Sequence, residues 1–154
     1  MSRNREAERD LWGALYIAGR RSFPDVIRRP SDMPRIQIFS KDQWGQVQRG
    51  HYDIRTQTIA LEDGDVEGIS ETLGHELTHH VQAKRTPGGG FIFSLIYQYF
   101  RIPFEQEAFK RGPGVAVLIR KYWLEVRAVR AVRVVAPPPL PMPDPWGLTA
   151  KYSP

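Results

Sequence analysis

The feature that most constrains the fold of this 154-residue chain is a periodic apolar stripe from about Val66 to Lys84. Its apolar side chains recur at every fourth position: Ile69, Leu73, Leu77 and Val81. This spacing predicts an α-helix, because residues four apart lie one turn apart on the same face. Asp65 stands where an N-cap residue is expected, and the run Thr86-Pro87-Gly88-Gly89-Gly90 ends the helix. The stripe must therefore be buried against the rest of the chain.

The same predicted helix carries an H-E-x-x-H motif, His75-Glu76-Leu77-Thr78-His79, on another side. With Ile69 set to 0° and about 100° per residue, the stripe spans roughly 0° to 120° and the two histidines fall at about 240° and about 280°. Two imidazoles one turn apart can bind one Zn²⁺ at about 2.0 to 2.1 Å. Zinc lowers the pKa of a bound water to about 7, and Glu76 lies where it can take the proton. The resulting hydroxide would attack a polarised carbonyl, which is the chemistry of a zinc-dependent hydrolase.

A catalytic zinc usually has three protein ligands, so one remains to be found. The chain has no cysteine, which excludes thiolate ligands and disulfides. Downstream, Glu105 and Glu107 follow Pro103, a residue that suits the first turn of a helix. On that helix Glu105 lies on the apolar side, whereas Glu107 points towards Lys110 and Arg111. We favour Glu105 as the third ligand and keep Glu107 as the alternative.

The third histidine of the helix, His80, falls at about 20°, beside Ile69. We therefore expect His80 to pack or hydrogen-bond at the core and not to bind the metal. A hydrolase of this kind also needs a hydrogen-bond donor for the transition-state oxyanion. The sequence leaves that role open among these groups: Tyr97, Tyr99, Tyr122, His80 and the arginines.

This set of residues resembles the gluzincin metallopeptidases, in which HExxH is followed by a glutamate on a later helix. The resemblance covers roughly residues 35 to 112, and the compact size is similar to that of the minimal single-domain gluzincins, the minigluzincins. In several gluzincin branches the glutamate stands three residues before an alanine, which matches Glu105 and Ala108. Many relatives place an aspartate directly after that alanine to support a ligand. Here the position is Phe109, so a carboxylate orienting the histidines must come from elsewhere, with Asp63 or Asp65 as candidates.

The resemblance implies an α+β, zincin-like domain with a short, largely antiparallel sheet, an HExxH active-site helix and a downstream glutamate-bearing helix. It implies one Zn²⁺ bound by His75, His79 and Glu105, with Glu76 catalytic, in a metalloendopeptidase that cleaves peptide or protein substrates. In such peptidases a strand edge beside the active-site helix binds the substrate as an added strand. The segment from Thr58 to Leu61 is the candidate edge, unless it is an inner strand.

Local patterns predict the remaining elements. Residues 2–21 are expected to form a helix, and alternating polar and apolar residues predict strands at 35–39, 46–54 and 58–61. Further helices are expected at 91–100, at 104–111 and at 115–135, the last two separated by Gly112-Pro113-Gly114. Six prolines between Pro137 and Pro145 predict an extended segment. We therefore divide the chain into a compact domain, 1–135, and a Pro-rich tail, 136–154.

The tail suggests a latent zymogen in which it lies in the active-site cleft, because the resemblance to minigluzincins includes latency through a terminal segment. A disordered tail or a partner-binding peptide is the alternative. At the other end, the charged sequence MSRNREAERD contains no apolar signal region, and the most apolar run, residues 91–100, is too short to span a bilayer. We expect a cytoplasmic protein, with secretion without a signal left open.

The net charge of +5 leaves a second class of function open. A mildly basic surface can attract nucleic acid or another acidic partner, so the zinc domain could be a non-catalytic binding or regulatory module. The chain has no helix-turn-helix or aromatic-rich RNA-binding signature, so nucleic acid is not the expected partner. A helical structural protein without metal is the third hypothesis.

Overall fold

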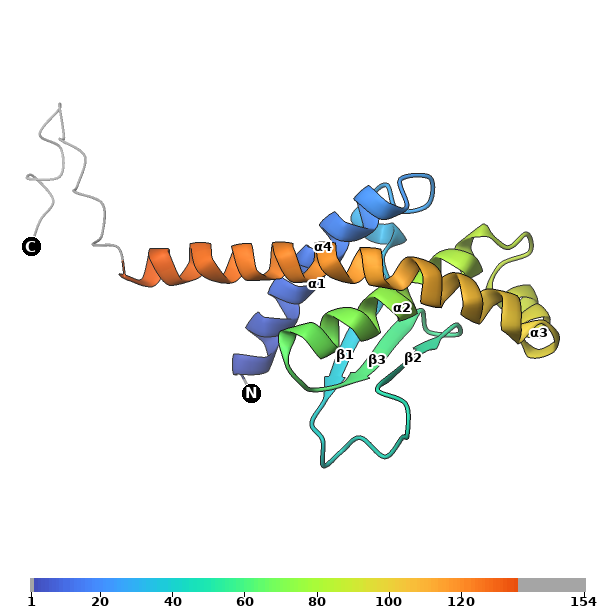
Figure 1. The fold of residues 1–154 in the computed structure, drawn as a ribbon, viewed down its shortest axis with the longest axis horizontal. Coiled ribbons are helices and arrows are strands. Elements are labelled where there is room, and N and C mark those ends of the chain that lie inside the picture. The colour runs from blue at the N-terminus through green and yellow to red at the C-terminus, as the bar shows by residue number, and fades with distance from the viewer. Residues whose placement is uncertain (1, 136–154) are drawn as a thin grey trace, which may run out of the picture.

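The structure of the protein is a computed structural model that describes residues 2–135, and Figure 1 shows the arrangement of its helices and strands. The N-terminal half contains these elements: α1 (Ser2–Ser22), a short 3-10 helix (Pro30–Asp32), β1 (Arg35–Phe39), β2 (Gly50–Asp53) and β3 (Thr58–Glu62). The C-terminal half is helical: α2 (Val66–Arg85), α3 (Gly90–Tyr99) and α4 (Arg101–Val135). The predicted α+β class is therefore confirmed. The predicted Pro-rich tail, with its inhibitory role, lies outside the described residues.

The three strands form a mixed sheet in the order β1-β3-β2. β1 pairs parallel to β3, and β2 pairs antiparallel to β3. The prediction of a largely antiparallel sheet is thus wrong for the β1–β3 pair. Four of the five residues of β3 are buried, and a continuous buried run suits the central strand of a sheet, whereas short β2 suits an edge.

The central position of β3 overturns a second expectation. Both backbone edges of β3 are already hydrogen-bonded to neighbouring strands, so the segment from Thr58 to Leu61 offers no free edge to a substrate. The outer strand on the side of α2 is β2, which is shorter than the predicted range 46–54. Trp44 explains the shortening, because its indole N–H donates to the Gln48 carbonyl at 2.7 Å and folds the preceding segment back on itself.

The apolar stripe of α2 is buried as the periodicity predicts, with Leu73, Leu77 and Val81 at 0% exposure. α2 packs on β2 and β3 and against α4, and α4 in turn packs against α1. The α1–α4 contact includes a charged pair, in which Arg130 donates to the mostly buried Asp10 carboxylate at 2.6 Å. The predicted N-cap is also confirmed, because the Asp65 carboxylate accepts from the Gly68 N–H at 2.7 Å.

The predicted break at Gly112-Pro113-Gly114 is wrong, since α4 continues through Pro113 and runs along the molecule (Figure 1). Proline inside a helix removes one backbone hydrogen bond and costs about 3 kcal/mol or more. The reason for its tolerance is tertiary. Gly112 lies directly against α2, where an added Cβ would stand only 3.2 Å from the His75 Cα. The two helices therefore gain burial along a contact that local propensity cannot foresee.

Gly74 on α2 makes this close approach from the other side. A Cβ on Gly74 would lie 2.4 Å from the Gly112 carbonyl oxygen and 3.0 Å from the Ala116 nitrogen. Both obstacles are backbone atoms, so neither can rotate away. The pair of glycines sets how near the His75 turn of α2 comes to α4, and thereby how near the HExxH motif comes to Glu105.

α3 differs from the other helices because it contains no charged residue and buries only Phe93. The exposed fraction of the side chain is 74% for Phe91 and 79% for Tyr99, on the face away from Phe93.

Within residues 2–135, no helix combines the length and the hydropathy that crossing a membrane would need.

Candidate metal centre

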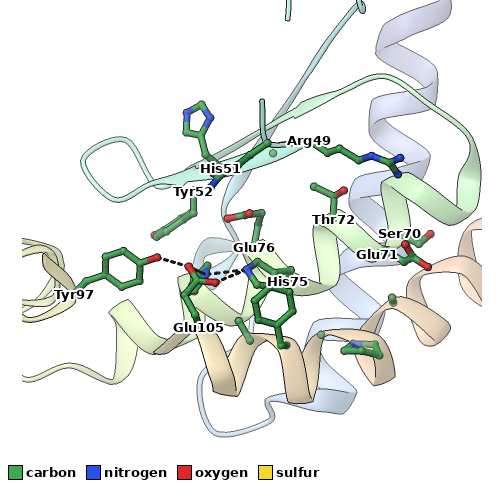
Figure 2. A pocket seen from close by; sticks show the side chains of 18 of the residues that line it. Arg49, His51, Tyr52, Ser70, Glu71, Thr72, His75, Glu76, Tyr97 and Glu105 are labelled. Atoms are coloured by element: carbon green, nitrogen blue, oxygen red, sulfur yellow. Dashed lines mark hydrogen bonds and ion pairs between the residues drawn. The ribbon is translucent and has the colours of Figure 1, made fainter. Parts of the chain in front are cut away.

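α2 presents His75 and His79 one turn apart, as the HExxH spacing predicts, and α4 brings Glu105 to meet them. The Nε2 atoms of the two histidines stand 3.2 Å apart. His75 Nε2 lies 3.0 Å from Glu105 Oε2, and His79 Nε2 lies 3.3 Å from Glu105 Oε1. These side chains form the group of potential metal ligands found within the described residues. Figure 2 shows His75 and Glu105 directed at one another across the two helices.

These separations fit a metal ion of the size and geometry of zinc. Ligand atoms about 2.0 to 2.1 Å from a tetrahedral Zn²⁺ stand roughly 3.3 to 3.4 Å from each other. The His75–His79 separation of 3.2 Å is close to one edge of such a tetrahedron, and each histidine nitrogen has a Glu105 oxygen at a similar distance, Oε2 at 3.0 Å from His75 and Oε1 at 3.3 Å from His79. Two imidazole nitrogens and one carboxylate oxygen are also ligands that zinc accepts, and a fourth position would remain for water or substrate.

The protonation states of this group suit a cation. Burial and the neighbouring His79 lower the pKa of His75, which favours the neutral imidazole that binds metals. Burial acts to raise the pKa of Glu105, but the hydrogen bond from Tyr97 and the two histidines outweigh it and hold that pKa below its usual value. The ionised carboxylate of Glu105 and the neutral imidazole of His75 therefore face one another, with the His79 ring nitrogen beside them.

Glu76 lies on the side of the centre that faces β2 (Figure 2). Its side chain is 8% exposed, and burial together with the nearby Glu105 raises its pKa to about 7. The Tyr52 backbone N–H of β2 donates a hydrogen bond to this carboxylate, which opposes the rise in pKa. Glu76 thus extends from α2 towards β2, next to the convergent side chains but outside their group.

Of the oxyanion candidates named from the sequence, Tyr97 enters the centre. Its hydroxyl donates to Glu105 Oε1, and its ring lies edge-on to His79 with centroids 5.6 Å apart. Burial and the bond to Glu105 raise the pKa of Tyr97 to about 12, so it stays a proton donor at neutral pH. Tyr99 is exposed and Tyr122 packs on the hydrophobic core. Arg101 lines the cleft and acts to lower the pKa of Tyr97.

His80 lies on the core side of α2 and is fully buried, as expected. The Asp32 carbonyl can only accept, so His80 Nε2 donates to it at 2.7 Å. His80 Nδ1 is then free to accept from the Tyr52 hydroxyl at 2.9 Å. Burial lowers the pKa of His80 to about 4, which keeps the ring neutral at pH 7. Its two hydrogen bonds tie α2 to β2 and to the segment before β1.

The sequence interpretation missed the groups that surround the two ligand histidines. Asp65 caps α2 and Asp63 accepts from the Gly64 N–H at 2.9 Å, so neither orients a histidine. Gln82 contacts the His79 ring, and Phe109 lies against the His75 ring with centroids 4.8 Å apart. A signal for Gln82 was present, since a polar residue three positions after His79 lies on the same helical face.

The centre lies in a cleft of about 1090 Å³ between β2, α2 and α4. The α4 wall is formed by residues three or four positions apart: Glu105, Ala108, Gly112, Ala116 and Arg120. On α2 the lining extends from Glu67 to His79, which is about 18 Å at 1.5 Å per residue. The continuous α4 therefore forms one long side of the cleft, a consequence of the Gly74–Gly112 approach.

Comparison with known proteins adds no relative to this description: no protein-family model, no curated protein and no solved structure matches the chain. Function must therefore be argued from the geometry of the centre and its cleft.

Proposed function

We propose that the protein is a zinc-dependent metalloendopeptidase with a zincin-like fold. The observation that carries the proposal is the convergence of His75, His79 and Glu105 at mutual distances of 3.0 to 3.3 Å, beside the buried carboxylate of Glu76. These three residues would hold one Zn²⁺, and zinc would supply Lewis-acid polarisation of a carbonyl and a lowered pKa for water.

Glu76 is the proposed general base and acid. Its carboxylate lies next to the ligand group and takes the proton of the attacking water, and the same group then delivers the proton to the departing amine. Tyr97 is the proposed donor to the oxyanion, because its hydroxyl already lies at the centre and its high pKa keeps the proton in place. In the free protein the same hydroxyl holds Glu105.

The cleft supports a polypeptide as substrate. The stretch of α2 from Glu67 to His79, about 18 Å long, corresponds to roughly five residues of an extended chain at about 3.3 Å each. β2 forms the wall opposite α4 and is the outer strand on this side of the sheet, so its backbone is the proposed pairing edge for substrate. A volume of about 1090 Å³ exceeds what a small-molecule site needs.

The experiment that tests the proposal separates metal binding from catalysis. Zinc content is measured for the wild type and for the variants His75→Ala, His79→Ala, Glu105→Ala and Glu107→Ala. We expect about one zinc in the wild type, loss of zinc in the first three variants, and zinc still bound in Glu107→Ala, whose side chain lies outside the ligand group. A wild type without zinc, or zinc loss with Glu107→Ala but not Glu105→Ala, would contradict the assignment.

Catalysis is then tested with Glu76→Gln on an unstructured protein substrate. We expect this variant to keep zinc and to lose activity by roughly 10²- to 10⁴-fold, the usual contribution of a general base. Equal activity of the wild type and Glu76→Gln would overturn the catalytic role. A zinc-containing wild type with no activity on any peptide library would instead favour the non-catalytic binding module.

A further inference from the structure

We infer that Gln82 is a positioning residue that selects which nitrogen of His79 faces the metal centre. The inference rests on the proposed zinc site and adds to it the device that prepares one of its ligands. His79 has two ring nitrogens, and a neutral imidazole protonates only one of them. A ring protonated at Nε2 would present a hydrogen to the centre instead of the lone pair that a metal requires.

The contacts of Gln82 determine the orientation of its amide. Its Nε2 lies 3.0 Å from the Phe104 carbonyl oxygen and 2.9 Å from Glu107 Oε2. The carbonyl and the carboxylate can only accept, so the amide NH₂ must point towards both. The amide oxygen is thereby directed to the other side, where it lies 2.8 Å from His79 Nδ1.

An amide oxygen cannot donate, so His79 Nδ1 must carry the proton of this hydrogen bond. His79 Nε2 is then unprotonated and presents its lone pair to His75 and Glu105, which lie 3.2 and 3.3 Å away. The Gln82 side chain is 4% exposed, so water competes little for these bonds. The chain of contacts thus determines the tautomer of His79 before any ion arrives.

Glu107 acquires a role in this arrangement, although it is not in the ligand group. One of its oxygens accepts from Gln82, and the other lies 3.9 Å from an Arg85 nitrogen. Arg85 lies in the last turn of α2 and also donates to Asp25 through two bonds of 3.0 Å. Glu105 and Glu107 therefore act at different distances from the centre: Glu105 as a member of the ligand group, and Glu107 through Gln82.

His75 shows that the arrangement is specific to one ligand. Its ring is packed against Phe109, an aromatic contact that provides no acceptor for a ring N–H. Both histidines have their Nε2 atoms at the centre, yet His79 receives its orientation from a buried amide and His75 from a side chain that is 70% exposed. Loss of Gln82 is therefore expected to affect His79 alone.

The test uses the full chain and measures zinc affinity by competition with a chromophoric chelator. We expect Gln82→Leu, which keeps the volume but removes the acceptor, to weaken zinc binding by about 10- to 100-fold. Glu107→Ala, which frees one anchor of Gln82, is expected to weaken it less. The control is Gln106→Ala, an exposed glutamine on α4 that should leave the affinity unchanged.

Two further measurements distinguish positioning from general stability. Nitrogen-15 NMR of the metal-free wild type should show His79 protonated at Nδ1, whereas His79 protonated at Nε2 would overturn the inference without any variant. Gln82→Glu alone keeps an acceptor for His79 but sets two carboxylates against each other, and adding Glu107→Gln restores a donor between the two side chains. We expect this exchange variant to recover most of the affinity that Gln82→Glu alone loses.

The failures of the two proposals are distinguishable. A wild type that binds no zinc contradicts the metallopeptidase, while His79 still shows its tautomer by NMR. A wild type that binds zinc together with a folded Gln82→Leu variant of unchanged affinity contradicts only the role of Gln82. If Gln82→Leu does not unfold cooperatively, it is not properly folded, and the role of Gln82 is then tested by the exchange variant and by the NMR spectrum of the wild type.

Discussion

The two sides of α2 differ in whether their polar side chains find partners within the protein. On the core side, Leu73, Leu77 and Val81 are at 0% exposure, and the polar His80 has partners for both ring nitrogens. On the cleft side, His75 and His79 face Glu105 with their acceptor atoms 3.0 to 3.3 Å apart. On the core side, the protein itself supplies the hydrogen-bond partners of His80. On the cleft side, several acceptor atoms lie close together, and a bound cation would satisfy them. The core side of α2 therefore contributes to the stability of the fold, whereas the cleft side carries the proposed metal ligands.

The largest effect is expected on the core side. Leu77→Ala removes a fully buried side chain and should lower the free energy of unfolding by about 2 to 5 kcal/mol. His75→Ala, on the cleft side of the same turns, should change the stability of the metal-free protein by less than about 1 kcal/mol. Urea unfolding of both variants in the presence of a chelator measures the difference. Equal losses would contradict the division between the two sides.

The next effect belongs to the cleft side and comes from the metal. Zinc binds only the folded protein in this proposal, so free zinc at a hundredfold excess over its dissociation constant should stabilise the fold by about 2.7 kcal/mol. Thermal unfolding with added zinc and with added chelator measures this shift. His79→Ala should abolish this shift, so that the melting temperature of the variant is the same with zinc as with chelator. A shift of the same size in His79→Ala would place the zinc elsewhere.

A substitution at the close contact between Gly74 of α2 and Gly112 of α4 should affect both the stability of the fold and the metal site. A Cβ at Gly74 would stand 2.4 Å from the Gly112 carbonyl oxygen, so Gly74→Ala must push α2 and α4 apart. Overpacking of this kind costs about 1 to 3 kcal/mol. Because Glu105 is carried by α4, zinc affinity should fall in parallel with stability. Gly13→Ala on α1, where an added Cβ meets nothing within 4 Å, is the matched control. Loss of stability with unchanged zinc affinity would show that the Gly74–Gly112 contact does not position the zinc ligands.

The smallest effect is expected for the ion pair between Arg85, at the end of α2, and Asp25, which lies on neither the core side nor the cleft side of the helix. The hydrogen bond from Arg85 lowers the pKa of Asp25 below 3.8. A lowered folded-state pKa stabilises the fold above the unfolded-state pKa, and this stabilisation is lost as the pH falls through the folded value. The Asp25 side chain is 57% exposed, so solvent screening limits the effect to less than about 1 kcal/mol.

Melting curves of the wild type and Asp25→Asn measure this last effect. The wild type should be slightly more stable near neutral pH, and the two curves should converge as the pH falls through the lowered folded-state pKa of Asp25, because both proteins then carry an uncharged side chain. A difference between them that persists or grows at low pH would mean that the pair does not act through the charge of Asp25.

Much of the helical part of the fold could be predicted because its signals are local. The apolar stripe and the cap at Asp65 predicted a helix from about Val66 to Lys84, and the structure has Val66–Arg85. The wheel position of His80 likewise agrees with its burial in the core. Each of these depends on contacts within about one helical turn, where periodicity and capping are sufficient guides.

The errors in the prediction share a physical cause, which is that pairing and packing between distant segments outweigh local propensity. The order β1-β3-β2 depends on which strand is buried on both faces, and α4 continues through Pro113 because Gly112 packs against the His75 turn. Gln82 shows the same limit. Its position on the helical face was readable from the sequence, but its contact with Glu107 joins two helices.

The sequence by itself determined the helix, its two faces and the residue types of a zinc ligand set, since a spacing of four residues is enough to align two imidazoles. Only the tertiary structure decided that Glu105 and not Glu107 reaches them. It also decided that β2 is the strand beside the cleft, and that Gln82 faces His79. These outcomes depend on the distance between α2 and α4, which two glycines and the surrounding core set together and which no single segment encodes.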